Sequence, residues 1–360
     1  MNAMLWKLFR SSWHKAVGAR TPGYSVMLAV PADLPVFLKI AMSTINAQQN
    51  AGLIETLVIP DMPTPEFEEA FARAKKDWSN GPIRLVTLHP LERFITKRIN
   101  SPHTNHWLQM TNGVEAAEST HVLLHDADLF ITDKNFLASH YAAMAKQDLV
   151  CLGINPVWDK WYAENGLGHV TATWELMFDV AWARLFKPWM HRGHNGVVNG
   201  KAHEFDTMLL PQSLTEAKRI DRHQGDWGFV HFNYVICTYR WFQENEKRGK
   251  SAYQDEHWRI LLVRLLVDAY QSTESEAAVP TLADLQKALT GESKRVDYRG
   301  ATAAKNYAEF RTKLEQLIDS GILDDYKVRI LREGIEPFDR AMGWNGAVSG
   351  LTSTSRAMSA

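Results

Sequence analysis

Five apolar runs, separated by stretches with helical spacing, constrain the fold of this chain more than any other feature of its sequence. The runs are YSVMLAVP, ETLVIPD, IRLVTLHP, THVLLHDADLFI and DLVCLGINPV, at 24–31, 55–61, 83–90, 120–131 and 148–157. Between them, apolar residues recur at helical spacing in 35–50, 64–78, 101–119 and 134–147. Strands that alternate with helices favour parallel βα units with helices on both faces of one sheet. The sequence therefore predicts an α/β fold with a mostly parallel central sheet.

Polar residues stand at or near the carboxyl ends of these runs, where open parallel sheets bind their ligands. The first run ends at Pro31, the second at Asp61, the third contains His89, and the fourth carries Asp126 and Asp128. Two acids inside an apolar run are costly unless something binds them. Where a strand ends and turns, both carboxylates can reach one cation, and hard oxygen ligands suit Mg²⁺ or Mn²⁺. The alternative is that one acid caps the following helix while the other is solvated.

The composition limits the kinds of partner. The chain has 40 Lys and Arg against 41 Asp and Glu, a net charge of −1, and so lacks the basic excess typical of nucleic-acid binders. No apolar run reaches the ~18 residues of a membrane-spanning helix. Cys151 and Cys237 lie in apolar runs, which favours buried free thiols in a reducing, cytoplasmic compartment, with a single disulfide as the alternative.

The N-terminal segment 4–17 has the pattern of an amphipathic surface helix. Leu5, Phe9 and Trp13 share one face, and the cations that could meet anionic lipid are Lys7, Arg10 and Lys15. Two of these cations interrupt any secretory signal. The segment would allow peripheral contact with the inner face of a membrane, and the alternatives are a helix packed on its own domain or a loose arm.

Three passages resemble the GT-A glycosyltransferases, in particular the family 2-like inverting enzymes. MTNGVEAAESTHVLLHDADLF resembles the passage that leads into and includes their Asp-x-Asp motif. KAHEFDTMLLPQ resembles the acidic start of a helix in these enzymes, and GDWGFVHFNY resembles a segment that supplies a histidine metal ligand. The passages occur in the family's order, and the likeness runs from about Tyr24 to Arg240. The resemblance implies a GT-A fold and a metal-dependent transfer of a sugar, with inversion, from a nucleotide-diphosphate donor to a hydroxyl of a glycan or other acceptor.

The resemblance also implies a metal site and a nucleotide site. Asp128 would coordinate Mn²⁺ or Mg²⁺, Asp126 would reach the ribose or a metal-bound water, and His231 would complete the metal shell. Pro31 would lie against the nucleoside. Asp61 would contact the base, although PDMPTP replaces the acid-rich run that is usual there.

Other candidate residues are less constrained by the motifs. Asn112 occupies the family's position before the Asp-x-Asp motif and is a further donor-site candidate. Lys97 and Arg98 could meet the diphosphate, or could belong to a solvated helix face. Asp206 or Glu204 would be the general base that activates the acceptor, and a helix N-cap is the alternative role for Asp206.

Several polar and aromatic residues complete the set of candidates. Glu175 is a third carboxylate that could face the acceptor, and His125 is expected to bond a neighbouring loop. Trp158, Trp161 and Trp227 stand next to polar residues or glycine and could stack on sugar rings, whereas most other tryptophans should fill the core.

The patterns along the chain predict a plan of four segments. Residues 1–22 form the arm or amphipathic helix, and 23–250 form the catalytic domain, with a nucleotide-binding half at 23–157 and an acceptor-facing half at 158–250. Helical patterns return in 251–340, and 341–360 reads as a disordered tail.

Three other functions are compatible with parts of this pattern. A nucleotidyltransferase would show a basic, glycine-rich loop after the first strand, and VPADLPVF has no glycine. A haloacid-dehalogenase-type phosphatase would carry Thr or Val two positions after the second acid, where this chain has Phe130. A catalytically silent sugar- or nucleotide-binding protein on the same fold also stays open, although the retained Asp126, Asp128 and His231 argue against it.

Overall fold

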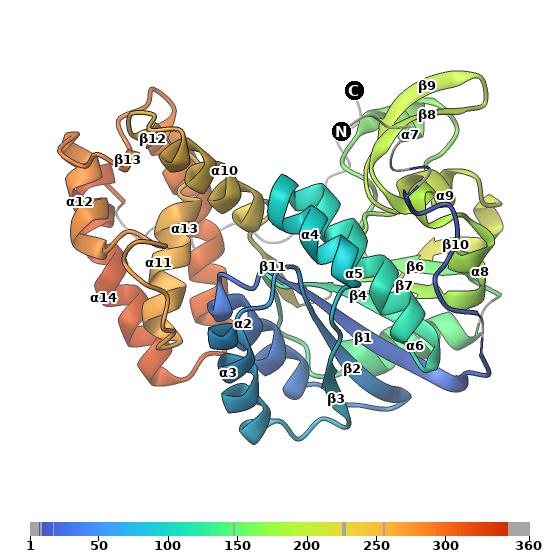
Figure 1. Ribbon diagram of the computed structural model, residues 1–360. Coiled ribbons are helices and arrows are strands. Elements are labelled where there is room, and N and C mark those ends of the chain that lie inside the picture. The colour runs from blue at the N-terminus through green and yellow to red at the C-terminus, as the bar shows by residue number, and fades with distance from the viewer. Residues whose placement is uncertain are drawn as a thin grey trace.

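The structure, a computed structural model, describes residues 7, 9–16, 18–146, 148–224, 228–254 and 256–344. Within this part of the chain, seven strands form a sheet in the order β10-β6-β7-β4-β1-β2-β3 (Figure 1). The strands are β1 (Thr21–Val30), β2 (Leu53–Pro60), β3 (Ile83–Leu85), β4 (Ser119–Asp126), β6 (Cys151–Gly153), β7 (Leu176–Asp179) and β10 (Ile220–Arg222). Neighbouring strands are parallel except β7, which is antiparallel to both β4 and β6. The predicted mostly parallel sheet is confirmed.

Helices cover both faces of this sheet. They include α2 (Pro35–Asn46), α3 (Pro65–Ala74), α4 (Pro90–Ile99), α5 (Pro102–Ala116), α6 (Phe136–Lys146) and α8 (Val180–Leu185), with a 3-10 turn, η1 (Lys75–Asp77), after α3. Along β1, Val26 and Leu28 enter the core that contains α2, whereas Met27 enters the core that contains α5. A strand buried on both sides must be apolar at nearly every position, which explains the continuous apolar runs of the sequence.

The predicted strand at 120–131 is in fact two strands. β4 ends at Asp126, the chain turns through Ala127 and Asp128, and β5 (Leu129–Ile131) pairs with β11 (Phe229–His231) in a separate antiparallel sheet. The register sets Leu129 opposite His231. This pairing brings a residue from a distant part of the chain to the end of β4.

No regular βα alternation continues after residue 157, as the sequence predicts. This part contains α7 (Lys160–Glu164), η2 (Pro188–His191), the hairpin of β8 (His194–Val198) and β9 (Lys201–Phe205), α9 (Leu209–Ser213), η3 (Ala217–Arg219) and α10 (Val235–Lys247). The two strands of the hairpin are antiparallel. α10 begins soon after β11, so it starts close to the end of β4.

The predicted C-terminal helical region is also confirmed. It contains α11 (Arg259–Ala269), α12 (Leu282–Thr290), α13 (Ala303–Asp319) and α14 (Asp325–Met342), with the short pair β12 (Tyr253–Gln254) and β13 (Val296–Asp297). These helices share one apolar core with α2 and β1. Lys39 of α2 donates hydrogen bonds of 3.1 and 2.9 Å to the carbonyls of Tyr270 and Gln271. The expected tail lies outside the described residues from 345 onward.

Part of the segment predicted at 4–17 packs on the domain, whereas Lys7 and Lys15 are exposed, so membrane contact of this arm stays a prediction. Arg10 is 0% exposed and forms ion pairs of 2.5 Å with Glu92 and 3.0 Å with Glu115. Phe9 and Trp13 pack against the core beneath α5, while Leu5 lies outside the described residues. Arg10, one of the three cations that could have met lipid, is therefore buried and anchors the arm to the domain. Within the described residues, no helix has the length and apolar character needed to cross a membrane.

Candidate active site

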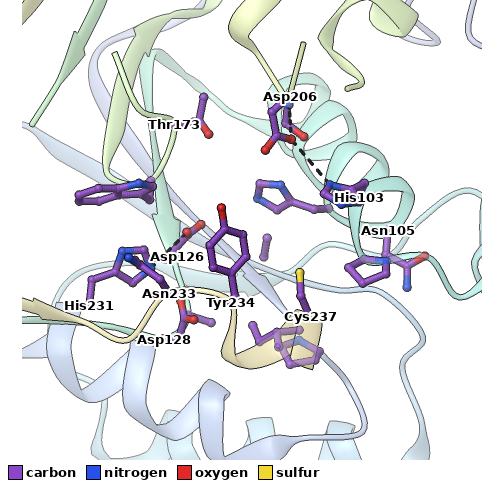
Figure 2. A pocket seen from close by; sticks show the side chains of 18 of the residues that line it. His103, Asn105, Asp126, Asp128, Thr173, Asp206, His231, Asn233, Tyr234 and Cys237 are labelled. Atoms are coloured by element: carbon purple, nitrogen blue, oxygen red, sulfur yellow. Dashed lines mark hydrogen bonds and ion pairs between the residues drawn. The ribbon is translucent and has the colours of Figure 1, made fainter. Parts of the chain in front are cut away.

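One cavity of about 720 Å³ opens where β1, β2 and β4 end. Of the candidates taken from the sequence, it is lined by Pro31, Asp61, Asp126, Asp128, Trp158, Asp206 and His231. Figure 2 shows Asp128 and His231 on one side of the cavity and Asp206 with His103 on another. The cavity thus holds two groups of polar side chains that face a shared space.

The first group has the geometry of a metal site. One ligand atom each from Asp126, Asp128 and His231 lies within 4.8 Å of the others. His231 Nε2 lies 3.3 Å from Asp128 Oδ1 and 3.7 Å from Asp126 Oδ2. Nδ1 of His231 is buried without a hydrogen-bond partner, whereas Nε2 faces the two carboxylates. Two carboxylates and an imidazole around one point fit a divalent cation such as Mn²⁺ or Mg²⁺.

The electrostatics of this group follow from its crowding. Burial and the nearby charge of Asp128 raise the pKa of Asp126. Burial alone would raise the pKa of Asp128, but the attraction and hydrogen bond of His231 outweigh it and lower that pKa. Burial opposes protonation of His231, and its two acidic neighbours outweigh burial, so its pKa is raised. The two acids therefore need a nearby positive charge, which His231 supplies in part.

Buried contacts hold the segments that carry these ligands. Lys313 of α13 donates a 2.9 Å hydrogen bond to the carbonyl of His231, whose ring lies 4.8 Å from that of Trp174. His125 and Glu175 form a fully buried hydrogen-bonded pair, and neither lines the cavity. Glu175 therefore does not face an acceptor in this structure, and His125 bonds the neighbouring segment as expected.

The second group is the carboxylate of Asp206, which follows β9. Its Oδ1 accepts a 2.6 Å hydrogen bond from the Thr207 amide and lies 3.7 Å from Nδ1 of His103. Burial raises the pKa of Asp206, but the bonds from His103 and the Thr207 amide outweigh burial and leave the pKa lowered. The same contact with Asp206 raises the pKa of His103. The cavity therefore holds an ionised carboxylate apart from the metal ligands.

Asp61 lines the cavity, but its carboxylate is already fully engaged. Oδ1 accepts hydrogen bonds from the amides of Ala32 (2.9 Å) and Met62 (2.8 Å). Oδ2 accepts from Asn105 Nδ2 (3.1 Å) and from the Arg240 guanidinium (2.8 Å). Four donors saturate a carboxylate. A base contact from this side chain would therefore require one of these bonds to break, and the visible role of Asp61 is to join the loops after β1 and β2 to α5 and α10.

Four other candidates lie away from the cavity lining. Asn112 is buried, and its Nδ2 donates a 2.6 Å hydrogen bond to Glu92. Lys97 and Arg98 lie on the exposed side of α4. Glu204 is exposed on β9. The structure thus leaves Asp206 as the carboxylate of this pair that faces the site.

Of the three tryptophan candidates, one lines the cavity, one does not, and one lies outside the described residues. Trp158 lines the cavity and is 53% exposed, so its indole can meet a ligand. Trp161 stacks on His203 at a ring distance of 3.9 Å and does not line the cavity. Trp227 lies outside the described residues. Trp174, which the sequence analysis did not single out, also lines the cavity.

Four further cavity residues escaped the sequence analysis. His103 and His106 project from one face of α5, and Nε2 of His106 is buried without a hydrogen-bond partner. Asn233 and Tyr234 also line the cavity, and both have left-handed backbone with φ of 36° and 62°. The spacing of the two histidines in PHTNH, three apart on a helix, was the available signal. The turn after His231 gave none, because asparagine and tyrosine are common residues of loops.

No protein-family model matches this chain, and neither does any curated protein. Among solved structures, the chain is similar to galactosyltransferase LgtC with donor and acceptor sugar analogs, at 16% identity, TM-score 0.37 and coverage of 46% of this chain and 62% of LgtC. It thus spans less than two thirds of LgtC. It is also similar to mannosyltransferase PcManGT from Pyrobaculum calidifontis with GDP-Man and Mn²⁺, at 13% identity, TM-score 0.38 and coverage of 96% and 95%.

A third similar structure is S. aureus TarS in complex with UDP-GlcNAc, at 12% identity, TM-score 0.38 and coverage of 88% of this chain and 92% of TarS. LgtC and PcManGT are both glycosyltransferases by name. With TM-scores below 0.5 and such low identities, these likenesses decide neither the fold nor the activity of this chain.

Proposed function

We propose that this protein is a GT-A-type glycosyltransferase that moves a sugar from a nucleotide-diphosphate donor to an acceptor hydroxyl with the help of a divalent metal. The observation that carries the proposal is the convergence of Asp126, Asp128 and His231 at the end of β4, in the same cavity as the separate carboxylate of Asp206. A glycosyl transfer needs a group that stabilises the departing diphosphate and a base that activates the acceptor hydroxyl. The metal ligands would serve the first need and Asp206 the second.

Asp126, Asp128 and His231 would hold Mn²⁺ or Mg²⁺, which supplies positive charge to stabilise the departing diphosphate. Pro31, at the end of β1, would lie beside the nucleoside, and Trp158 would offer its indole face to a sugar ring. With these contacts the donor would lie across the ends of the parallel strands.

Asp206 would accept the proton of the acceptor hydroxyl. As the hydroxyl oxygen of the acceptor attacks the anomeric carbon of the donor sugar, the bond from that carbon to the diphosphate breaks. The Asp206 carboxylate retains the proton. Asp206 stands on another side of the cavity from Asp128 and His231 (Figure 2). With the diphosphate at the metal site, an acceptor beside Asp206 would attack from the face opposite the leaving group. We therefore propose an inverting transfer, with Asp206 rather than the exposed Glu204 as the base.

Calorimetric titration of a panel of uridine- and guanosine-diphosphate sugars in the presence of Mn²⁺ tests the proposal. We expect at least one donor to bind, and binding to disappear when a chelator removes the metal. Asp128→Asn should abolish metal-dependent binding, whereas Asp148→Asn, at a side chain that is 99% exposed, should bind as the wild type does.

Each alternative outcome has a clear meaning. If no nucleotide sugar binds the wild type with Mn²⁺, the transferase proposal is wrong. If Asp128→Asn binds the donor with unchanged metal dependence, the assigned metal ligands are wrong. A donor that binds without transfer to water or to any acceptor hydroxyl would favour a catalytically silent sugar-binding protein instead.

A further inference from the structure

α4 buries two polar side chains and exposes two large apolar ones, unlike an ordinary surface helix, although Ile95 and Ile99 still pack against the core. The fully buried side chains of this helix are Glu92 and Thr96. In contrast, Phe94 is 61% exposed and Leu91 is 50% exposed. A surface helix normally turns its large apolar side chains inward and its charges outward.

The inward polar residues of α4 have internal partners. Glu92 pairs with the buried Arg10 and accepts a 2.6 Å hydrogen bond from Asn112. Thr96 donates a 3.3 Å hydrogen bond to the carbonyl of Asp61, at the end of β2. The orientation of α4 is therefore fixed by buried contacts, and Phe94 and Leu91 are held toward the solvent.

The outward face of α4 is also strongly basic. Its exposed side chains are Pro90, Leu91, Arg93, Phe94, Lys97 and Arg98. The Arg98 guanidinium lies 6.0 Å from the centre of the Phe94 ring. Among the described residues, none of the three cations takes part in an ion pair, and the one acid of α4 is the buried Glu92. Two large apolar side chains thus stand among three unpaired positive charges.

We propose that this exposed face of α4 binds the surface of a membrane that contains anionic lipids. Phe94 and Leu91 would enter the boundary between head groups and acyl chains, and Arg93, Lys97 and Arg98 would meet the lipid phosphates. An anionic lipid surface suits both halves of the face. A purely electrostatic partner would leave the apolar pair in water.

The place of α4 connects such docking to the cavity. α5 follows α4 after a two-residue link, and its first residues, Pro102 and His103, line the cavity (Figure 1). A membrane bound at α4 would lie beside this part of the cavity rim. The proposed membrane contact lies on α4, and it does not rest on the proposed function.

Flotation of the full chain with lipid vesicles tests this proposal. We expect the wild type to float with vesicles of phosphatidylcholine that contain phosphatidylglycerol, and not with phosphatidylcholine alone. The triple variant Arg93→Gln, Lys97→Gln, Arg98→Gln should lower the partition coefficient about a hundredfold, since each cation near an anionic surface contributes roughly a fivefold factor and the three factors multiply. Leu91→Ala with Phe94→Ala should also weaken binding.

Matched variants separate this effect from changes of net charge and apolar surface. The exposed residues Lys75, Lys76 and Lys247, each changed to Gln, remove the same charge elsewhere, and Leu185→Ala with Tyr326→Ala removes exposed apolar surface elsewhere. Both control variants should float as the wild type does. Equal loss in the controls, equal binding to neutral vesicles, undiminished flotation of the α4 variants, or a wild type that does not float would each overturn the proposal. Undiminished flotation of the variants would point to another face, and a wild type that does not float would point to a protein partner. Nucleotide binding, measured on the same samples, reports on the proposed function separately.

Discussion

At the scale of single residues, the proposed reaction depends on the charge of Asp206. Asp206→Asn preserves the size of the side chain and its bond from the Thr207 amide but cannot accept a proton. We expect the turnover rate to fall by about 10²–10⁴-fold, with nucleotide affinity unchanged by calorimetry. Glu204→Gln is the matched control, because Glu204 is exposed outside the cavity lining, and its rate should stay close to the wild-type rate. A comparable loss in Glu204→Gln would contradict this assignment.

The contact between His103 and Asp206 predicts a shift in the pH profile. A base works only when it is ionised, so activity is lost as the pH falls through the pKa of Asp206. Because His103 helps to hold that pKa below its ordinary value, His103→Gln should raise it, and the acidic limb of the rate should move to higher pH.

The rate measured across the acidic range, at saturating donor, checks this shift. His14→Gln provides a control at an exposed histidine outside the cavity lining, and its profile should match that of the wild type. An acidic limb that stays in place in His103→Gln would show that His103 does not set the charge of Asp206.

At the scale of elements, Gly113 sets how closely α5 approaches the sheet. A Cβ atom at this position would lie 2.0 Å from Met27 Sδ of β1 and 2.7 Å from Ile59 Cδ1 of β2. Gly113→Ala must push α5 away or displace buried side chains, and we expect the free energy of unfolding to fall by about 1–3 kcal/mol in urea titrations. Gly18→Ala adds the same methyl group where no atom lies within 4 Å, so stability should be unchanged. Equal stability of both variants would argue against close packing at Gly113.

Sequence patterns could predict the elements whose apolar residues face the core at the usual strand or helix spacing. β1 and β2 are apolar on both faces, and α5 appears where helical spacing predicts it. The turn at Ala127 was not visible as a break, because Leu129 and Phe130 continue the apolar pattern although they belong to another sheet. No helix was predicted over α4, where tertiary contacts bury Glu92 and expose Phe94, against the usual amphipathic pattern.

At the scale of the whole molecule, the candidate site is assembled by long-range pairing. Asp126 and Asp128 stand out in the sequence because they interrupt an apolar run. His231 joins them through the register of β5 with β11, and only the resemblance to a known family suggested it beforehand. Asp206 reaches the same cavity from the hairpin, beside His103 of α5. The sequence could indicate acids and a histidine as candidate site residues. Their convergence on one cavity depends on long-range packing that no local pattern encodes.

The N-terminal arm provides a test of how the whole molecule is tied together. Arg10 compensates Glu92 of α4 and Glu115 of α5, and all three side chains are at most 4% exposed. Arg10→Met keeps the length of the aliphatic part but leaves two buried carboxylates without their cation. We expect the free energy of unfolding to fall by about 3–5 kcal/mol, as for other buried pairs that lose one partner. Lys15→Met, at an exposed cation of the same arm, should change it by less than about 0.5 kcal/mol. Urea titration of the full chain measures both, and equal stability of the two variants would mean that the arm does not anchor α4 and α5.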